Sequence, residues 1–217
     1  MSGSTHLKPT KILLSLVALA GCATEPPADY DALTAQMMAA SFRDEGIAKV
    51  DRLTQDEANA ACSKAQGASL ADAQTTAIQQ AALKGVRYPA DGKFIGDWRE
   101  GEKLAQNGRG MTWTDRSAAP AANGGNCYNC HQLSKAEISY GTIGPSLYQY
   151  GKTRGVTDPD SALSRPILEY TWAKIWNPRI TNACSEMPRF GHAGLLDEAQ
   201  IRHLMALILD PKSPVNQ

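Results

Sequence analysis

One pentapeptide in the middle of the chain constrains what this protein can be more than any other feature. Cys127 and Cys130 are separated by two residues and His131 follows directly, which is the C-x-x-C-H pattern of c-type haem attachment. Two cysteines about one helical turn apart can add to the two vinyl groups on one edge of a porphyrin. The next residue then lies under the ring, where its imidazole can ligate iron. We therefore expect one covalently attached haem c, held by these three residues.

Two other chemistries use the same C-x-x-C pair. A dithiol redox motif has this spacing, and so does half of a zinc site. A zinc site needs a second ligand pair, and Cys62 and Cys184 do not have the spacing of one. The adjacent histidine favours haem over both alternatives, as does the export signal described next.

Residues 1–21 have the pattern of a signal peptide. A basic, polar start is followed by an apolar run from Ile12 to Ala20, which is too short to cross a bilayer. Leu19-Ala20-Gly21-Cys22 resembles the lipobox of bacterial lipoproteins, and that resemblance implies that Cys22 becomes the first mature residue and carries lipid. Ala23, in place of an aspartate, favours the outer membrane. An ordinary signal peptide with a chance cysteine is the alternative, and both imply export to the periplasm, where disulfides persist.

The remaining chain predicts an all-α fold in two regions. Residues 22–90 are a Pro-rich tether followed by an N-terminal helical extension, in which Thr54-Gln55-Asp56-Glu57 has the pattern of a capping box before a helix that carries Cys62. A second helix near residues 72–84 should end at Gly85. After a turn-rich boundary, residues 91–217 should form the haem domain.

Three helices are expected in that second region. Phe94, Trp98, Gly101 and Ala105 fall at steps of three or four and define one helical face, whose small residues allow close approach of another helix. A second helix has Ile167, Ile175 and either Tyr170 or Thr171 on one face, between Pro166 and Pro178. The last should begin after Asp197, with Gln200 completing a capping box, and present an apolar stripe containing Ile201, Leu204, Met205 and Ile208.

Charge gives no sign of a nucleic-acid partner. The chain has 22 basic and 22 acidic residues, hence a formal net charge of zero. No membrane contact is expected except through the lipid anchor.

The sixth iron ligand has five candidates in the sequence: Met111, Met187, Met205, His192 and His203. Met205 lies on the apolar stripe of the last helix and is most simply a core residue, and His203 should point off that stripe. Met111 lies in a loop before the haem motif and stays open, as does His192. Met187 lies between two expected helices and is followed by proline, so we predict that its thioether is the ligand; such a soft donor raises the potential relative to bis-histidine ligation.

Counting cysteines predicts one disulfide. Five cysteines, less one for lipid and two for haem, leave Cys62 and Cys184 in an oxidising compartment. Their pairing would close a loop of over a hundred residues, which stabilises by about 4–5 kcal/mol in the chain-entropy model. It would also fix the segment just before Met187.

The segment after the haem motif resembles that of class I cytochromes c. Gly144-Pro145-Ser146-Leu147 is similar to their G-P-x-L segment, and the resemblance implies that the Pro145 carbonyl accepts the Nδ1 proton of His131. A plain turn is the alternative. A class I cytochrome c-like haem domain with an N-terminal helical extension is therefore the expected architecture.

Longer stretches resemble SoxX, the monohaem subunit of the SoxAX complex of bacterial thiosulfate oxidation. The most specific are Gly141-Thr142-Ile143-Gly144-Pro145-Ser146-Leu147 and the segment from Ser185 to His192, and the resemblance is dense over residues 88–217. It implies a non-catalytic, electron-accepting haem subunit of an L-cysteine S-thiosulfotransferase. A SoxA-like cytochrome would carry the catalytic haem, and thiosulfate would be joined there to a cysteine of a SoxYZ-like carrier protein before electrons pass to a downstream acceptor.

A lipoprotein leader departs from the soluble complex that this family suggests. The alternative is a stand-alone cytochrome c that shuttles electrons in the periplasm while anchored to a membrane. A five-coordinate haem sensor or peroxidase is a further alternative, and it needs an open iron face. In none of these do we assign a catalytic residue to the chain.

Overall fold

The computed structural model describes residue 3 and residues 28–217, so the signal peptide and Cys22 lie outside the described residues. The chain divides into two compact units, residues 1–41 and 42–217, which we describe separately. In the first unit, helix α1 (Tyr30–Ser41) begins where the Asp29 carboxylate accepts a hydrogen bond from the Ala32 amide, at 3.0 Å. No residue of α1 is buried.

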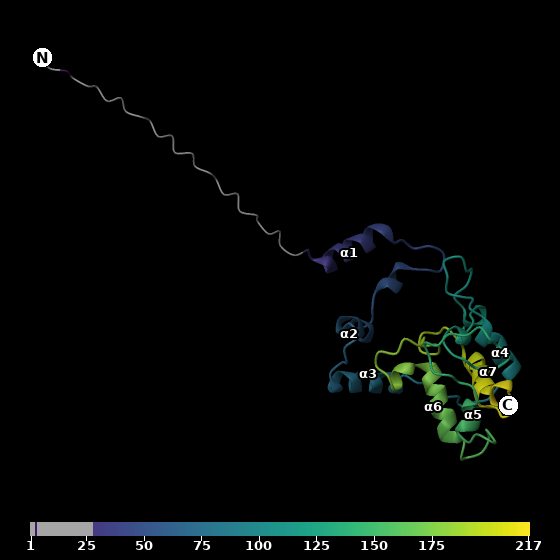
Figure 1. Ribbon diagram of the computed structural model, residues 1–217. Coiled ribbons are helices and arrows are strands. Elements are labelled where there is room, and N and C mark those ends of the chain that lie inside the picture. Colours follow the sequence, from purple (N-terminus) through teal and green to yellow (C-terminus); the bar gives the residue numbers. More distant parts are fainter. Residues whose placement is uncertain (1–2, 4–27) are drawn as a thin grey trace. The chain divides into compact units, whose positions relative to one another are not determined.

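The second unit is built of helices joined by long loops (Figure 1). Its elements are the 3-10 helices η1 (Val50–Leu53), η2 (Pro120–Ala122), η3 (Cys127–Asn129), η4 (Pro178–Ile180) and η5 (Pro214–Asn216), and the α-helices α2 (Glu57–Ala65), α3 (Asp72–Lys84), α4 (Trp98–Gln106), α5 (Tyr150–Thr153), α6 (Arg165–Trp176) and α7 (Glu198–Leu209). Within the described residues there is no strand, only one isolated bridge between Glu45 and Ala48. The prediction of an all-α protein is confirmed.

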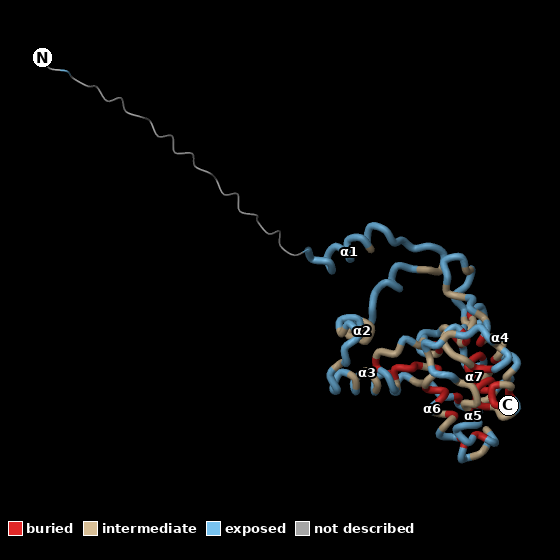
Figure 2. The backbone as a smooth tube through the Cα atoms, in the orientation of Figure 1, coloured by how far each residue is buried: buried red, intermediate tan, exposed pale blue. Residues whose placement is uncertain are grey.

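The core forms where α4 and α6 pack against α7, which is buried along nearly its whole length (Figure 2). Gly101 and Ala105 of α4 are buried against α7, as their spacing predicts. A Cβ at Gly101 would lie 2.7 Å from the carbonyl carbon of His203 and 3.0 Å from Cβ of Leu207. The absence of a side chain therefore lets the two helix backbones approach closely.

The caps of the later helices follow the sequence. Asp197 and Gln200 form the predicted capping box at the start of α7. Helix α6 has a proline in its first turn and ends before Pro178. Of the two alternatives on its inner face, Thr171 is buried, whereas Tyr170 is 40 % exposed.

The start of α2 differs from its predicted position. The capping box from Thr54 does not form; the helix begins at Glu57, and its N-cap is Asp56, whose carboxylate accepts from the Asn59 amide at 2.7 Å. An aspartate is as good a cap as a threonine, and this one also has cationic partners elsewhere in the fold. Helix α3 ends at Gly85 as predicted. Because α3 packs against η4, the predicted domain boundary near residue 90 lies inside one compact unit.

None of the helices in the described part of the chain combines the length and the hydropathy that a membrane span requires.

Candidate functional site

The cysteines of the C-x-x-C-H motif lie on a tight turn. Residues 127–129 form η3, in which the amides of Cys130 and His131 both donate to the Cys127 carbonyl, at 3.1 and 2.9 Å. Asn126 enters the turn in the left-handed region, with φ of 49°. Both thiols are free and half-buried. One turn of 3-10 rather than α geometry therefore presents two free thiols and an imidazole in close succession.

Backbone hydrogen bonds connect the loop that follows to this turn. The amides of Gly141, Gly144 and Leu147 donate to the carbonyls of Tyr128, Cys130 and Gln132, at 2.7–2.8 Å. This regular pairing carries the loop back alongside the motif.

His131 is held by that loop from two directions. Its Nδ1 lies 2.7 Å from the Pro145 carbonyl oxygen, which can only accept, so Nδ1 carries the proton and donates. The neutral ring then has an unprotonated Nε2 with a free lone pair. Gly144 lies directly against the ring, since a Cβ there would come within 2.7 Å of Nε2. The predicted hydrogen bond is present, and it prepares Nε2 to bind a metal.

Tyr128, the first residue between the cysteines, joins the motif to α4. Its buried hydroxyl donates to the Glu102 carboxylate at 3.0 Å and accepts from the Ser134 amide at 3.2 Å. Burial raises the pKa of the Tyr128 phenol far above its usual value, and the Glu102 charge adds to the effect. The phenol is thus a fixed donor that anchors the turn.

The Cys127 thiol is neutral at every ordinary pH. Burial raises its pKa to about 12. Its surroundings are apolar: the side chain packs against the main core cluster, on the side where Leu104 and Leu204 lie. A thiol in this state is not an exposed nucleophilic thiolate of the kind that dithiol redox motifs use.

Met187 packs against the same core cluster as Cys127 and is half-buried. It lies in the irregular segment between η4 and α7. Four residues further on, Gly191 packs directly against the ring of Trp176 in α6, since a Cβ there would come within 2.9 Å of the ring. The His192 amide also donates to the Trp176 carbonyl at 3.1 Å. The Met187 segment is therefore fixed on its C-terminal side by α6.

The other candidate ligands have different surroundings. Met205 is fully buried within α7, as expected for a core residue. Nδ1 of His203 accepts from the Asp97 amide at 2.9 Å, at the start of α4. Met111 has a φ of 65°, and its carbonyl accepts from Arg52 at 2.7 Å. His192 is largely exposed. The pKa of its imidazole is lowered, first by desolvation of the part that contacts the protein and second by the charge of Arg189.

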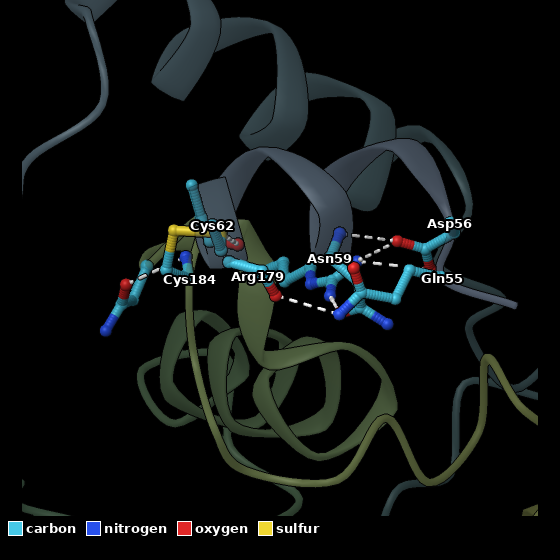
Figure 3. The surroundings of a disulfide bond; sticks show 9 residues. Gln55, Asp56, Asn59, Cys62, Arg179 and Cys184 are labelled. Carbon is cyan, nitrogen blue, oxygen red and sulfur yellow. Dashed lines mark hydrogen bonds and ion pairs between the residues drawn. A yellow bond between two sulfur atoms is a disulfide. The ribbon is translucent and has the colours of Figure 1, made fainter. Parts of the chain in front are cut away.

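The predicted disulfide between Cys62 and Cys184 is present, with the Cα atoms 5.6 Å apart and a sequence separation of 122 (Figure 3). It joins α2 to the segment that precedes Met187. This prediction is confirmed.

Sequence reasoning missed a polar cluster beside the bridge. The Asp56 carboxylate accepts from Arg189 at 2.6 Å. It also accepts from Arg179 at 3.2 Å, and the second amino group of Arg179 donates to Asn59 (Figure 3). Burial raises the pKa of the Asp56 carboxyl, but the Asn59 amide and the two arginines outweigh it and bring the value to about 2. The signal in the sequence is Asp56 directly before a helix, but the pattern Thr54-Gln55-Asp56-Glu57 equally predicts a box capped by Thr54.

The described residues contain no group of three or more His, Cys, Asp and Glu side chains able to hold a metal ion.

Comparison with known proteins relates part of the chain to a lipoprotein. No family model matches the chain. Over 136 residues it is 38 % identical to an uncharacterized lipoprotein of Aquifex aeolicus (strain VF5). The match covers 61 % of this chain and 58 % of the relative, so the chain spans little more than half of the relative's length.

Proposed function

We propose that the protein is a c-type cytochrome that holds one haem through Cys127, Cys130 and His131, with Met187 as the sixth ligand. The observation that carries the proposal is the state of His131: Nδ1 donates to the Pro145 carbonyl, so Nε2 is the free ligand nitrogen, beside two free thiols on one turn. A thioether on the rim of the same apolar core completes a donor set that fits a haem c.

When bound, haem supplies a one-electron Fe(III)/Fe(II) couple. The chain's own residues then have distinct tasks. Cys127 and Cys130 retain the group covalently, Pro145 orients the His131 ring and raises its basicity, and the apolar core limits access of water. Met187, a soft donor, favours the reduced iron and so raises the potential.

Met187→Leu tests this ligand assignment. We expect the sulfur-to-iron charge-transfer band to disappear and the potential to fall, while haem remains covalently attached. Met205→Leu is the matched control, because a buried Met-to-Leu exchange conserves volume and costs less than about 1.5 kcal/mol. A band that survives in Met187→Leu and disappears in Met205→Leu would move the ligand to α7.

Within this class we propose the role of a SoxX-like, electron-accepting subunit in a SoxAX-type complex that conjugates thiosulfate to a carrier-protein cysteine. The resemblance over residues 88–217 suggests it. An observation that supports a partner subunit is the apolar surface in the loop after the haem motif, where Ile138 and Ile143 are 90 % and 80 % exposed. The sulfur chemistry would belong to a SoxA-like partner and a SoxYZ-like carrier, and electrons would leave through this chain.

The alternative is a stand-alone shuttle anchored to a membrane by lipid on Cys22. The Aquifex relative is named a lipoprotein, which supports a lipid anchor on this chain. The expected signal peptide favours the periplasm, and Ala23 favours the outer membrane. Purification of the full chain from cells grown on thiosulfate separates the two functions. A SoxX-like subunit should elute with a second haem-staining cytochrome, and Ile143→Asp should release it; a monomeric red protein would support the shuttle.

A further inference from the structure

A cavity of about 420 Å³ lies beside the disulfide, and both bridged cysteines line it. The remaining wall is mainly polar and includes Gln55, Asn59, Ser63, Arg179 and Ser185. Cys62 and Cys184 are half-buried, and the neighbouring Ser63 and Ala68 are exposed. The bridge therefore lies beside a polar cavity rather than in the apolar core.

The bridge holds an element that has little else to hold it. No residue of α2 is buried. Besides the disulfide, its described polar contacts with the rest of the unit are those of Asp56 and Asn59 with Arg179 and Arg189. Apolar packing thus contributes little to keeping α2 in place.

The disulfide and the Asp56–Arg189 ion pair both reach the segment that carries Met187, whereas Arg179 belongs to η4. Cys184 precedes Met187 by three residues, and Arg189 follows it by two. Cutting the bridge would remove the covalent link on the N-terminal side of this segment. The buried Ala183 and short local hydrogen bonds, such as that from the Met187 amide to the Ser185 hydroxyl at 3.3 Å, would remain there. The C-terminal side would keep Arg189 and the contact of Gly191 with Trp176.

We propose that the Cys62–Cys184 bridge is a thiol–disulfide exchange site, open through this cavity to a dithiol reductant, and that its reduction frees the segment around Met187. One thiolate of the dithiol attacks a bridge sulfur, a mixed disulfide forms, and the other cysteine leaves as a thiolate that takes up a proton. The second thiol of the reductant then displaces the first cysteine. The bridge gains two electrons and two protons, and the dithiol becomes a disulfide.

The cavity wall suits this chemistry. Arg179 and Glu186 are the charged residues of the cavity wall. The Arg179 side chain is 8 % exposed, and its guanidinium binds Asp56 and Asn59. Its Nε has no hydrogen-bond partner among the described residues. A cationic neighbour stabilises a thiolate and so favours exchange. The exchange itself does not depend on the proposed haem, whereas its consequence for iron ligation through Met187 rests on the proposed function.

The test uses the full, folded chain and dithiothreitol as the dithiol, followed by alkylation and mass analysis of the peptides that contain Cys62 and Cys184. Without denaturant, we expect both cysteines to be alkylated within about tenfold of the rate in denatured protein, because access controls the reaction. Ala68→Trp and, separately, Ser63→Phe should slow reduction by about tenfold or more by filling the cavity. Ala73→Trp is the matched control on the exposed face of α3, outside the cavity, and should have no effect.

Hydrogen exchange supplies a second readout that needs no haem. Amides of residues 184–189 should exchange faster after reduction, while those of α7 should keep their protection. In haem-loaded protein the charge-transfer band should weaken in parallel. Reduction only in denaturant, or at the same rate in Ala68→Trp and Ser63→Phe as in the wild type, would overturn the exchange site. Unchanged exchange at residues 184–189 after reduction would overturn the release, and a change there without any effect on the band would place the fault in the Met187 assignment instead.

Discussion

His131 owes its position to two neighbours in the following loop. The Pro145 carbonyl fixes the protonation of Nδ1, and Gly144 leaves the space that the ring occupies. The first is an electrostatic constraint on the tautomer, and the second is a steric constraint on where the ring lies. Both act before any ligand binds, so the imidazole is preorganised.

Gly144→Ala should therefore damage the site through crowding. The new Cβ would meet the His131 ring, so the ring or the loop must shift, and overpacking of this kind costs about 1–3 kcal/mol. Urea unfolding would measure the loss, and the covalent haem content would report the displaced histidine. Gly85→Ala is the control, since its Cβ would meet only ordinary contacts at 3.5–3.8 Å. Equal effects of the two substitutions would show that crowding of His131 is not the cause.

Among the elements, the crossing of α4 and α7 sets the geometry of the core. The motif turn is attached to α4 through the hydrogen bond between Tyr128 and Glu102. The packing of α4 on α7 therefore also determines where the motif turn lies relative to the core.

Gly101→Ala should destabilise the protein, although the same exchange inside an unconstrained helix stabilises by about 0.5–1 kcal/mol. The sign reverses because the new Cβ meets the backbone of α7 at His203, and the expected cost is about 1–3 kcal/mol. The midpoint of urea unfolding measures it. Lys103→Ala, on the exposed side of α4, should change the stability by less than about 0.5 kcal/mol. A stabilised Gly101→Ala would contradict the close packing.

The stability that the Asp56 ion pairs give to the attachment of α2 should decrease at acid pH. The Asp56 pKa is lowered from 3.8 to about 2, so the unfolded chain binds its proton first as the pH falls. Its contribution to stability is complete above about pH 4 and is lost as the pH drops through about 2. Asp56→Asn keeps a helix cap but removes the charge, so the difference in unfolding free energy between wild type and variant should shrink over that window. A difference that stays constant from pH 5 to pH 2 would exclude the ion pairs as its source.

On the scale of the whole molecule, the unit of residues 42–217 has its own core, and the candidate lipid site lies in the other unit, outside the described residues. If Cys22 carries lipid, the full chain should fractionate with membranes and partition into detergent. Cys22→Ser should release it to the soluble periplasmic fraction with its haem spectrum unchanged, because Cys22 is not part of the core unit. Equal partitioning of both proteins would favour the ordinary signal peptide.

Local patterns determined most of the elements. Spacing of apolar and small residues predicts α6, α7 and most of α4, although α4 begins at Trp98 and leaves Phe94 in the preceding loop. The short-range chemistry of Asp197 with Gln200 and of Gly85 marks helix ends correctly. Counting cysteines was enough for the disulfide, because only one pair was left over. These predictions succeeded since the interactions involved are close in sequence or limited to very few combinations.

Only the tertiary structure decided the rest. Asp56 forms ion pairs with Arg179 and Arg189, at sequence separations of 123 and 133. Tyr128 forms a hydrogen bond with Glu102 on another helix. Sequence periodicity does not predict such pairs, because any of the 22 basic residues could pair with any carboxylate until packing brings one of each together. The same long-range contacts favoured Asp56 over Thr54 as the cap of α2: a local rule allows either residue, and the arginines that also bind the carboxylate are placed by the fold.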